Sequence, residues 1–316
     1  MRIGRALVAF LAPAAACVLA AACASSKVPT RVQAFADATT LTATNVADTL
    51  TAVENSFVAV RLDQAVLDFD RQGLDPREVA SWHFLSDGDR KARLDILKAL
   101  ERYAGNLAAL AGGTRFAAFD ESTRSLGESL GQVNDDLVRQ RLLSHAPASD
   151  EDVRLFATAI NALGHWLIAG ASARGVREQV HAMQEPVARI CDLLVLDLGA
   201  PPEPGKAGSG LRLQLWNQYD QALEQQDLFL RHNQERLDPV VRRSEIRALA
   251  TIATEQRRAD AALAATQDAV RGLGRAHGQL AAALDGQAVE FDALIGTLLA
   301  GGERIKTFYG SLAAGH

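Results

Sequence analysis

Ser129 lies in the pentapeptide GESLG, residues 127–131, which matches the G-x-S-x-G spacing of a nucleophilic serine. That chemistry needs a strained turn between a strand and a helix, with the serine at its apex. Here Leu126, Leu130 and Val133 continue a helical apolar period straight through the motif, and no strand precedes it. The sequence therefore favours a solvent-facing helix residue at Ser129, and we predict that the protein is not an enzyme.

Glu178 and His181 form an E-x-x-H pair, the spacing that places two metal ligands on one helix face in di-iron bundles. Such a site needs two of these motifs and two further glutamates, and the chain holds only one motif. A solvent-facing pair is the favoured interpretation. We predict no metal site and no cofactor.

Asn161 and His165 lie four residues apart within residues 155–173, a stretch that carries no charged side chain. The stretch is long enough to span a bilayer, but polar groups within lipid are costly. We therefore predict a helix buried on all sides by its neighbours. Asn161 and His165 are then a hydrogen-bonded core pair or, alternatively, a ligand-binding site in a pocket near His165.

Cys23 closes an uncharged, Ala-rich N-terminal stretch that follows Arg2 and Arg5. The end of this stretch, LAAAC at residues 19–23, resembles the lipobox of bacterial lipoproteins. Leu19 stands one place earlier than the Leu that the family prefers. The resemblance implies cleavage after residue 22, lipidation of Cys23 and, because Ala24 follows, sorting to the outer membrane.

Two alternatives for Cys23 stay open. An ordinary signal peptidase can use residues 22–24, ACA, as an A-x-A site, which would discard this cysteine. Otherwise Cys23 is an unmodified apolar residue in an uncleaved anchor. Under the lipoprotein interpretation, residues 1–22 are a signal peptide and residues 23–30 are the lipidated cysteine and a polar tether.

The charge and cysteine content exclude several classes of function. The chain has 316 residues and a net charge of −5, and loss of residues 1–22 would remove two arginines and no acid. Such an acidic chain without clustered Lys, Arg and aromatic residues is not expected to bind nucleic acid. Cys191 would remain the only unmodified cysteine, which excludes an internal disulfide and favours packing as a small hydrophobe.

Apolar residues recur three and four positions apart along most of the chain, as on one face of a helix. The clearest stripes are Val46, Leu50, Val53, Phe57 and Val60, and Ala259, Leu263, Thr266, Val270 and Leu273. No long alternating run indicates a sheet. We predict an all-α fold, an elongated bundle of six to eight helices with coiled-coil-like packing.

Residues 199–210, GAPPEPGKAGSG, form the clearest linker. They divide a helical bundle over 31–198 from long helices over 211–316, and they either separate two domains or form a long loop within one. A seven-residue apolar repeat over 280–312 predicts a coiled-coil seam. We expect the helices after the linker to pack on the first half, with another molecule as the alternative.

These observations predict a non-enzymatic lipoprotein of the cell envelope, held at the periplasmic face of the outer membrane by its N-terminal lipid. As a protein-binding or structural module, it would pair with another envelope protein or with itself. The alternative is a periplasmic helical protein that binds a small molecule or a metal.

Overall fold

The computed structural model describes residues 11–113, 123, 125–132, 149–169, 175–287 and 290–313. Within those ranges, side chains are described from Lys27 to Lys306, with 68, 70–72 and 169 left out. The described residues form an all-α fold, as predicted, with two isolated β-bridges in one loop. Nine helices with defined bounds lie in these ranges: α1 (Leu11–Gln72), α2 (Pro76–Ala80), α3 (Asp87–Ala111), α5 (Asp150–Ala169), α6 (Val176–Ala182), α7 (Gln184–Leu198), α8 (Gly210–His232), α9 (Pro239–Leu284) and α10 (Phe291–Ala313).

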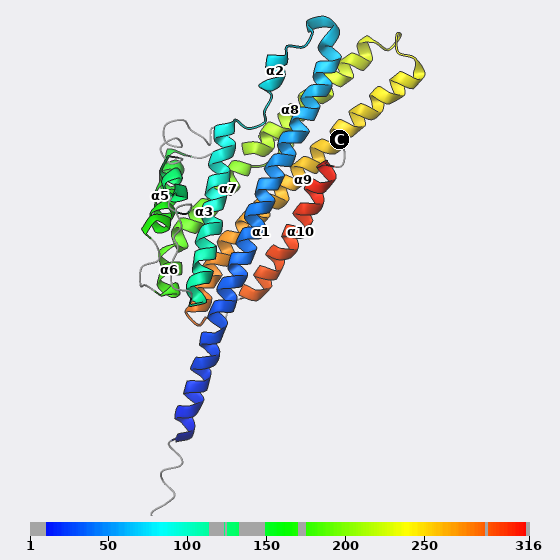
Figure 1. Ribbon diagram of the computed structural model, residues 1–316. Helices are drawn as coiled ribbons and strands as arrows, with labels where there is room; N and C mark the ends of the chain where they lie inside the picture. The colour runs from blue at the N-terminus through cyan, green and yellow to red at the C-terminus, as the bar shows by residue number, and fades with distance from the viewer. Residues whose placement is uncertain are drawn as a thin grey trace, which may run out of the picture.

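The bundle is elongated because two of its helices are long (Figure 1). At about 1.5 Å per residue, the 62 residues of α1 extend about 93 Å and the 46 residues of α9 about 69 Å. Helix α1 contacts α3, α8, α9 and α10, and α7 packs between α5 and α9. The N-terminal part of α1 protrudes alone from one end of the bundle.

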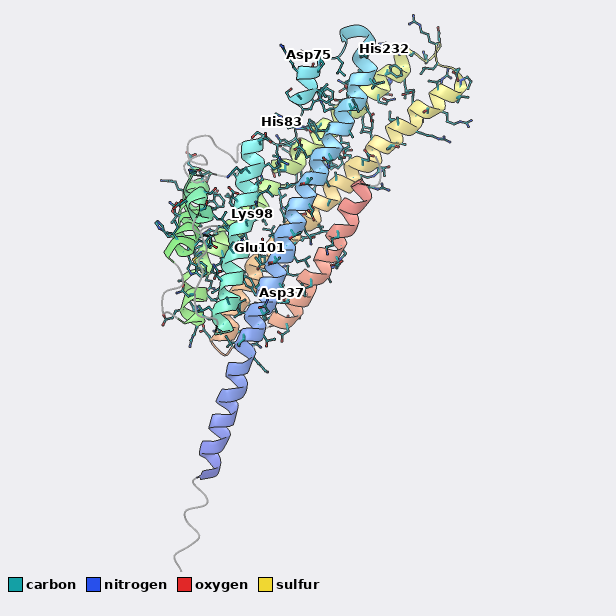
Figure 2. The ribbon with its side chains drawn as sticks, viewed as in Figure 1. Asp37, Asp75, His83, Lys98, Glu101 and His232 are labelled. Carbon is teal, nitrogen blue, oxygen red and sulfur yellow. The ribbon has the colours of Figure 1, made fainter. Side chains whose placement is uncertain are left out.

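The opposite end, which we call the distal end, holds the C-terminus of α1 and the connection between α8 and α9. Figure 2 shows Asp37 near the end from which α1 protrudes and His232 at the distal end. Both the α1 tip and the α8–α9 hairpin extend beyond α3, α5 and α10 in Figure 1. The distal end therefore consists of helices with few neighbours.

The apolar stripes predicted from the sequence form the core. All five residues from Val46 to Val60 are buried, as are all five from Ala259 to Leu273. Serine hydroxyls cap the first turns of two helices. The Ser86 hydroxyl accepts from the Asp89 N–H, and the Ser149 hydroxyl accepts from that of Asp152, so each caps its helix.

Residues 199–210 form a compact reverse connection between α7 and α8. Ala200 pairs with Ser209 and Glu203 with Lys206, in two antiparallel bridges. Gly199 has φ +72°, and a Cβ built on it would lie 2.0 Å from the carbonyl oxygen of Ser209, so only glycine fits. Beyond this connection, α9 contacts α7 and α1, and α10 contacts α1 and α9. The helices of the second half thus pack on the first.

One sequence expectation needs correction. The seven-residue repeat over 280–312 does not form one continuous seam, because α9 ends at Leu284 and α10 begins at Phe291. Gly286, at φ +79°, lies in the turn between them, and the two helices pack as a hairpin. Residues 23–30, for which the sequence predicts a lipidated cysteine and a polar tether, are helical, since α1 continues through them.

Candidate functional site

Ser129 lies on a helix that covers residues 125–132, so the strained turn of a nucleophile elbow is absent there. The glycine before it has a packing reason instead. A Cβ on Gly127 would lie 2.7 Å from Cγ1 of Ile168 and 3.0 Å from the carbonyl oxygen of Gly164. Gly127 and Gly164 thus let this helix and α5 cross closely.

The Ser129 hydroxyl connects this helix to α3. It donates to Oδ2 of Asp95 at 2.8 Å, and the ammonium of Lys91 bonds the same oxygen at 2.5 Å. Ser129 is half-buried in this contact rather than fully solvent-facing. The three side chains form a structural link between two helices.

Asn161 and His165 are both exposed, so the prediction of a buried pair is wrong. Helix α5 packs on α7, on α3 and, through Gly164, on the helix over 125–132, and both residues lie on the face that these neighbours leave open. An uncharged sequence was compatible with either arrangement, because threonine, asparagine and histidine are tolerated on a solvated face. A ligand-binding role for Asn161 and His165 stays a prediction.

Glu178 and His181 are exposed, as the sequence indicated. His181 Nε2 lies 3.0 Å from Oδ1 of Asp285, and Nε of Arg177 donates to the same oxygen at 2.7 Å. The hydrogen bond with His181 and the charge of Arg177 lower the pKa of Asp285 below its ordinary value. This contact attaches α6 to the turn after α9. Among the described residues, no three His, Cys, Asp or Glu side chains are arranged to hold a metal ion.

Cys191 is a buried free thiol in the core, which confirms its prediction as a small hydrophobe. Burial, and then the charge of Asp192, raise the pKa of this thiol to about 12. A thiol with so high a pKa is a poor nucleophile at neutral pH. The side chain of Cys23 lies outside the described residues.

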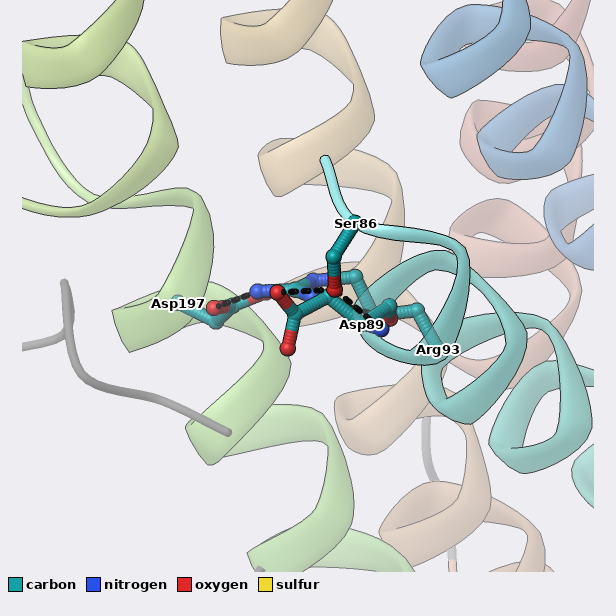
Figure 3. Close-up of polar contacts among 4 residues, drawn as sticks. All are labelled: Ser86, Asp89, Arg93 and Asp197. Carbon is teal, nitrogen blue, oxygen red and sulfur yellow. Dashed lines mark hydrogen bonds and ion pairs between the residues drawn. The ribbon is translucent and has the colours of Figure 1, made fainter. Parts of the chain in front are cut away.

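Arg93 and Asp197 form a buried ion pair that no sequence motif indicated (Figure 3). Nε and Nη2 of Arg93 donate to Oδ2 and Oδ1 of Asp197 at 2.7 and 2.6 Å, and Nη1 donates to the carbonyl of Asp89. Burial opposes the charge on Arg93, but Asp197 more than compensates, and the net effect raises the pKa of Arg93. The pair links the first turns of α3 to the end of α7.

A second buried polar contact joins Tyr103 on α3 to His277 on α9, with 2.7 Å between the hydroxyl and Nε2. The rings of Phe35 and Trp166 pack edge-on against His277 and Tyr103, respectively. Burial lowers the pKa of His277 to about 3 and raises that of Tyr103 well above 10. The histidine is therefore neutral at physiological pH and belongs to the core.

One cleft among the described residues has the volume of a small-ligand site. It encloses about 340 Å³ between α1, α8 and residues 73–86, which we call the strap. The strap includes α2, none of whose residues is buried, and stands off from the bundle in Figure 1. Its last residues are fixed to α1, because the carboxylate of Glu54 accepts from the backbone N–H groups of Phe84 and Leu85.

The distal end exposes bulky apolar side chains. Eight of the twelve large hydrophobic residues that are exposed in the described structure lie there: Leu62, Val66, Phe69, Leu74, Leu228, Val240, Val241 and Ile246. Single exposed hydrophobics are common on protein surfaces, but a local concentration marks an interaction surface. The sequence interpretation missed this surface, although the spacing of apolar residues along α1 already indicated it.

That signal is a change from polar to apolar side chains along one face of α1. Residues on its solvent-exposed face are polar over the first part of the bundle, at Asp37, Thr44, Thr51 and Asn55. Steps of seven, four and three residues keep the same face. The next residues on that face form what we call the distal stripe: Leu62, Val66 and Phe69, which are 49%, 67% and 57% exposed.

Searches of known protein families, curated proteins and solved structures find no match to this chain. Among the described residues, no helix combines the length and apolarity needed to cross a bilayer.

Proposed function

We propose that this protein is a non-enzymatic lipoprotein, anchored through Cys23 at the periplasmic face of the bacterial outer membrane, whose distal end docks another envelope protein. The anchor rests on the resemblance of residues 19–23 to a lipobox. The course of α1 supports it, because the segment before Cys23 belongs to the part that protrudes alone from the bundle. Removal of residues 1–22 would leave the packed helices in place.

Helix α1 then sets the distance between membrane and partner. It is one helix through Cys23 and up to Gln72, and the 49 steps between these residues at about 1.5 Å each give about 74 Å. The lipid lies at one end of this helix and the distal stripe at the other. The protein acts as a strut that holds a binding surface away from the membrane.

The single observation that carries the docking role is the change from polar to apolar residues on the solvent-exposed face of α1. Leu62, Val66 and Phe69 follow each other at steps of four and three, the spacing that receives one partner helix. Exposure of these apolar side chains to water is unfavourable in free energy. Covering apolar surface contributes about 25 cal/mol per Å², so a partner helix is the natural occupant.

The charge at the same end indicates the chemistry of that partner. Arg236, Arg242, Arg243 and Arg247 are all exposed around the tip of the α8–α9 hairpin. Three acids lie among them: Asp238 accepts from the N–H groups of Val240 and Val241, Glu245 accepts from Gln226, and Glu235 is exposed, so the arginines are in excess. Two copies meeting at this end would bring arginines together. The partner is therefore a different protein that presents an amphipathic helix with acidic flanks.

The experiment compares two matched variants of the full-length protein in cells. Leu62→Gln/Phe69→Gln removes the apolar groups of the distal stripe. Thr44→Gln/Thr51→Gln places the same side chain on the same face of α1, nearer the anchor. After chemical crosslinking and purification, we expect one partner protein with the wild type and the control, and its loss with the stripe variant.

The charge argument is tested in the same assay with Arg243→Glu/Arg247→Glu, which should also lose the partner. A synthetic peptide of the partner's acidic helix should bind the wild type and fail to bind both distal variants. Equal recovery from the stripe variant and the wild type would refute docking at this surface. Recovery of the protein itself as the crosslinked species would refute the acidic partner.

A further inference from the structure

We infer that the cleft under the strap is a binding site for a carboxylate attached to a small apolar body. The cleft lies beside the distal stripe on α1 but on a different face, and the inference is independent of partner docking. Its floor consists of Phe57 and Val60, both buried side chains of α1. Its walls are polar, from Gln218 and Gln221 on α8 and from residues of the strap. An apolar floor with a few polar groups is the composition of a ligand site.

Arg61 supplies the positive charge. Its guanidinium carbon lies 5.5 Å from the ring centroid of Trp82, and Nη1 donates to Oε1 of Gln64 at 3.2 Å. The counter-charge is loose, because Nη2 is 3.9 Å from Oε1 of Glu78, whose side chain is 62% exposed. The other nearby carboxylate, Glu54, already accepts two backbone N–H groups. A ligand carboxylate can therefore replace Glu78 on Arg61 at low cost.

The cleft offers several hydrogen-bond donors beside Arg61. The indole N–H of Trp82 is buried and has no acceptor among the described residues, which costs free energy until an acceptor arrives. The amides of Gln218 and Gln221 can each donate to a ligand through their NH2 groups, and the strap's Glu78 is the one lining carboxylate. Donors around a guanidinium favour an anionic ligand. The planar guanidinium can donate two parallel N–H bonds to the two oxygens of a carboxylate.

The volume limits the ligand. About 340 Å³ is at the lower end of small-molecule sites, enough for an aromatic ring or a short aliphatic chain on the floor with its carboxylate at Arg61. Two sources present this chemistry: a free aliphatic or aromatic acid, and the C-terminus of a polypeptide that ends in an apolar residue. The experiment separates them.

The test uses calorimetric titration of the full-length protein with matched probes. 4-Phenylbutyrate is compared with 4-phenylbutanamide, which has the same body without the charge. An acetylated tetrapeptide that ends in a free phenylalanine carboxylate is compared with its C-terminal amide. We expect each acid to bind at least about tenfold more tightly than its amide, the effect of one charge-assisted hydrogen-bonded pair. The acid of higher affinity identifies the source.

Three variants tie the binding to the cleft. Arg61→Gln should reduce the affinity for the acid to that of the amide. Because Arg61 also holds the strap through Trp82, Gln218→Leu on the opposite wall is the second variant, and it should weaken binding several-fold without changing the melting temperature. Arg77→Gln, an exposed arginine of α2 outside the lining, should leave the affinity unchanged.

The inference is overturned if no probe binds, if acid and amide bind equally, or if Arg77→Gln weakens binding as much as Arg61→Gln. The last result would show general attraction of anions to the surface. Docking of a partner at the distal stripe is measured separately, so either proposal can fail alone.

Discussion

Asn45 on α1 donates a hydrogen bond from its side-chain amide to the backbone carbonyl of Gly302 on α10, with 3.1 Å between the two atoms. The contact requires glycine. A Cβ on residue 302 would lie 2.6 Å from Cδ2 of Leu41 and 2.8 Å from Nδ2 of Asn45. The last helix, α10, therefore packs closely against the first, α1, within one bundle.

Gly302→Ala should therefore destabilise the protein by about 1–3 kcal/mol, because the methyl group forces α10 away from α1. Gly301→Ala is the matched control, since nothing lies within 4 Å of a Cβ at that position. Alanine is the better helix former, so the control should be neutral or stabilised by up to about 1 kcal/mol. Urea unfolding followed by circular dichroism measures both. Equal effects of the two substitutions would refute the close contact.

Arg93 and Asp197 should behave as a coupled pair. Arg93→Met or Asp197→Leu alone leaves one buried charge without its partner and should cost about 3–5 kcal/mol. The double variant removes both charges and should recover most of that loss, because apolar side chains of similar size suit the site. The measurement is a double-mutant cycle of unfolding free energies. Additive losses would contradict the direct pairing.

His277 predicts a dependence of stability on acid pH. Burial holds its pKa at about 3 in the folded protein, against an ordinary value of 6.5. Between these values the unfolded chain binds a proton that the folded protein does not, so the free energy of unfolding decreases as the pH falls. The slope from this one group is at most about 1.4 kcal/mol per pH unit.

His277→Gln keeps a polar group near Tyr103 and should flatten the stability profile between pH 6.5 and 3, at some cost in stability at pH 7. The exposed His232→Gln is the control and should leave the profile of the wild type unchanged. Urea titrations at several pH values give both curves. A wild-type slope retained in His277→Gln would show that other groups cause the acid sensitivity.

The local features of the fold followed from the sequence because helix periodicity is a local property. The stripes from Val46 to Val60 and from Ala259 to Leu273 are examples. Periodicity does not say which helices meet. The pairing of Arg93 with Asp197, 104 residues apart, had no sequence signal for that reason.

The candidate sites also depend on which helices, distant in sequence, pack together. The cleft combines α1, the strap and α8, which are far apart in the chain, so its lining residues form no motif. The exposure of Asn161 and His165 depended on which face of α5 its neighbours cover. The distal stripe could have been predicted from the sequence, because Leu62, Val66 and Phe69 lie on the same helix face as the polar residues that precede them. Recognising it required knowing which face of α1 meets the core.

The anchor is tested by Cys23→Ser. We expect the wild type to incorporate labelled palmitate and to partition into the detergent phase, since several acyl chains hold a protein firmly at a membrane. The variant should lose both properties while it keeps its helical circular dichroism. Labelling that persists in Cys23→Ser would exclude lipidation at this residue.

The most direct measurement of the proposed docking role is a photo-crosslinking scan along the exposed face of α1. A photoreactive phenylalanine analogue replaces Thr44, Thr51, Leu62, Val66 and Phe69 one at a time in cells, and the adduct yield is measured at each position. We predict a step: no adduct at the two threonines, and one acidic partner protein captured from Leu62 onward. A uniform yield along the face, or none at the three distal positions, would contradict the account.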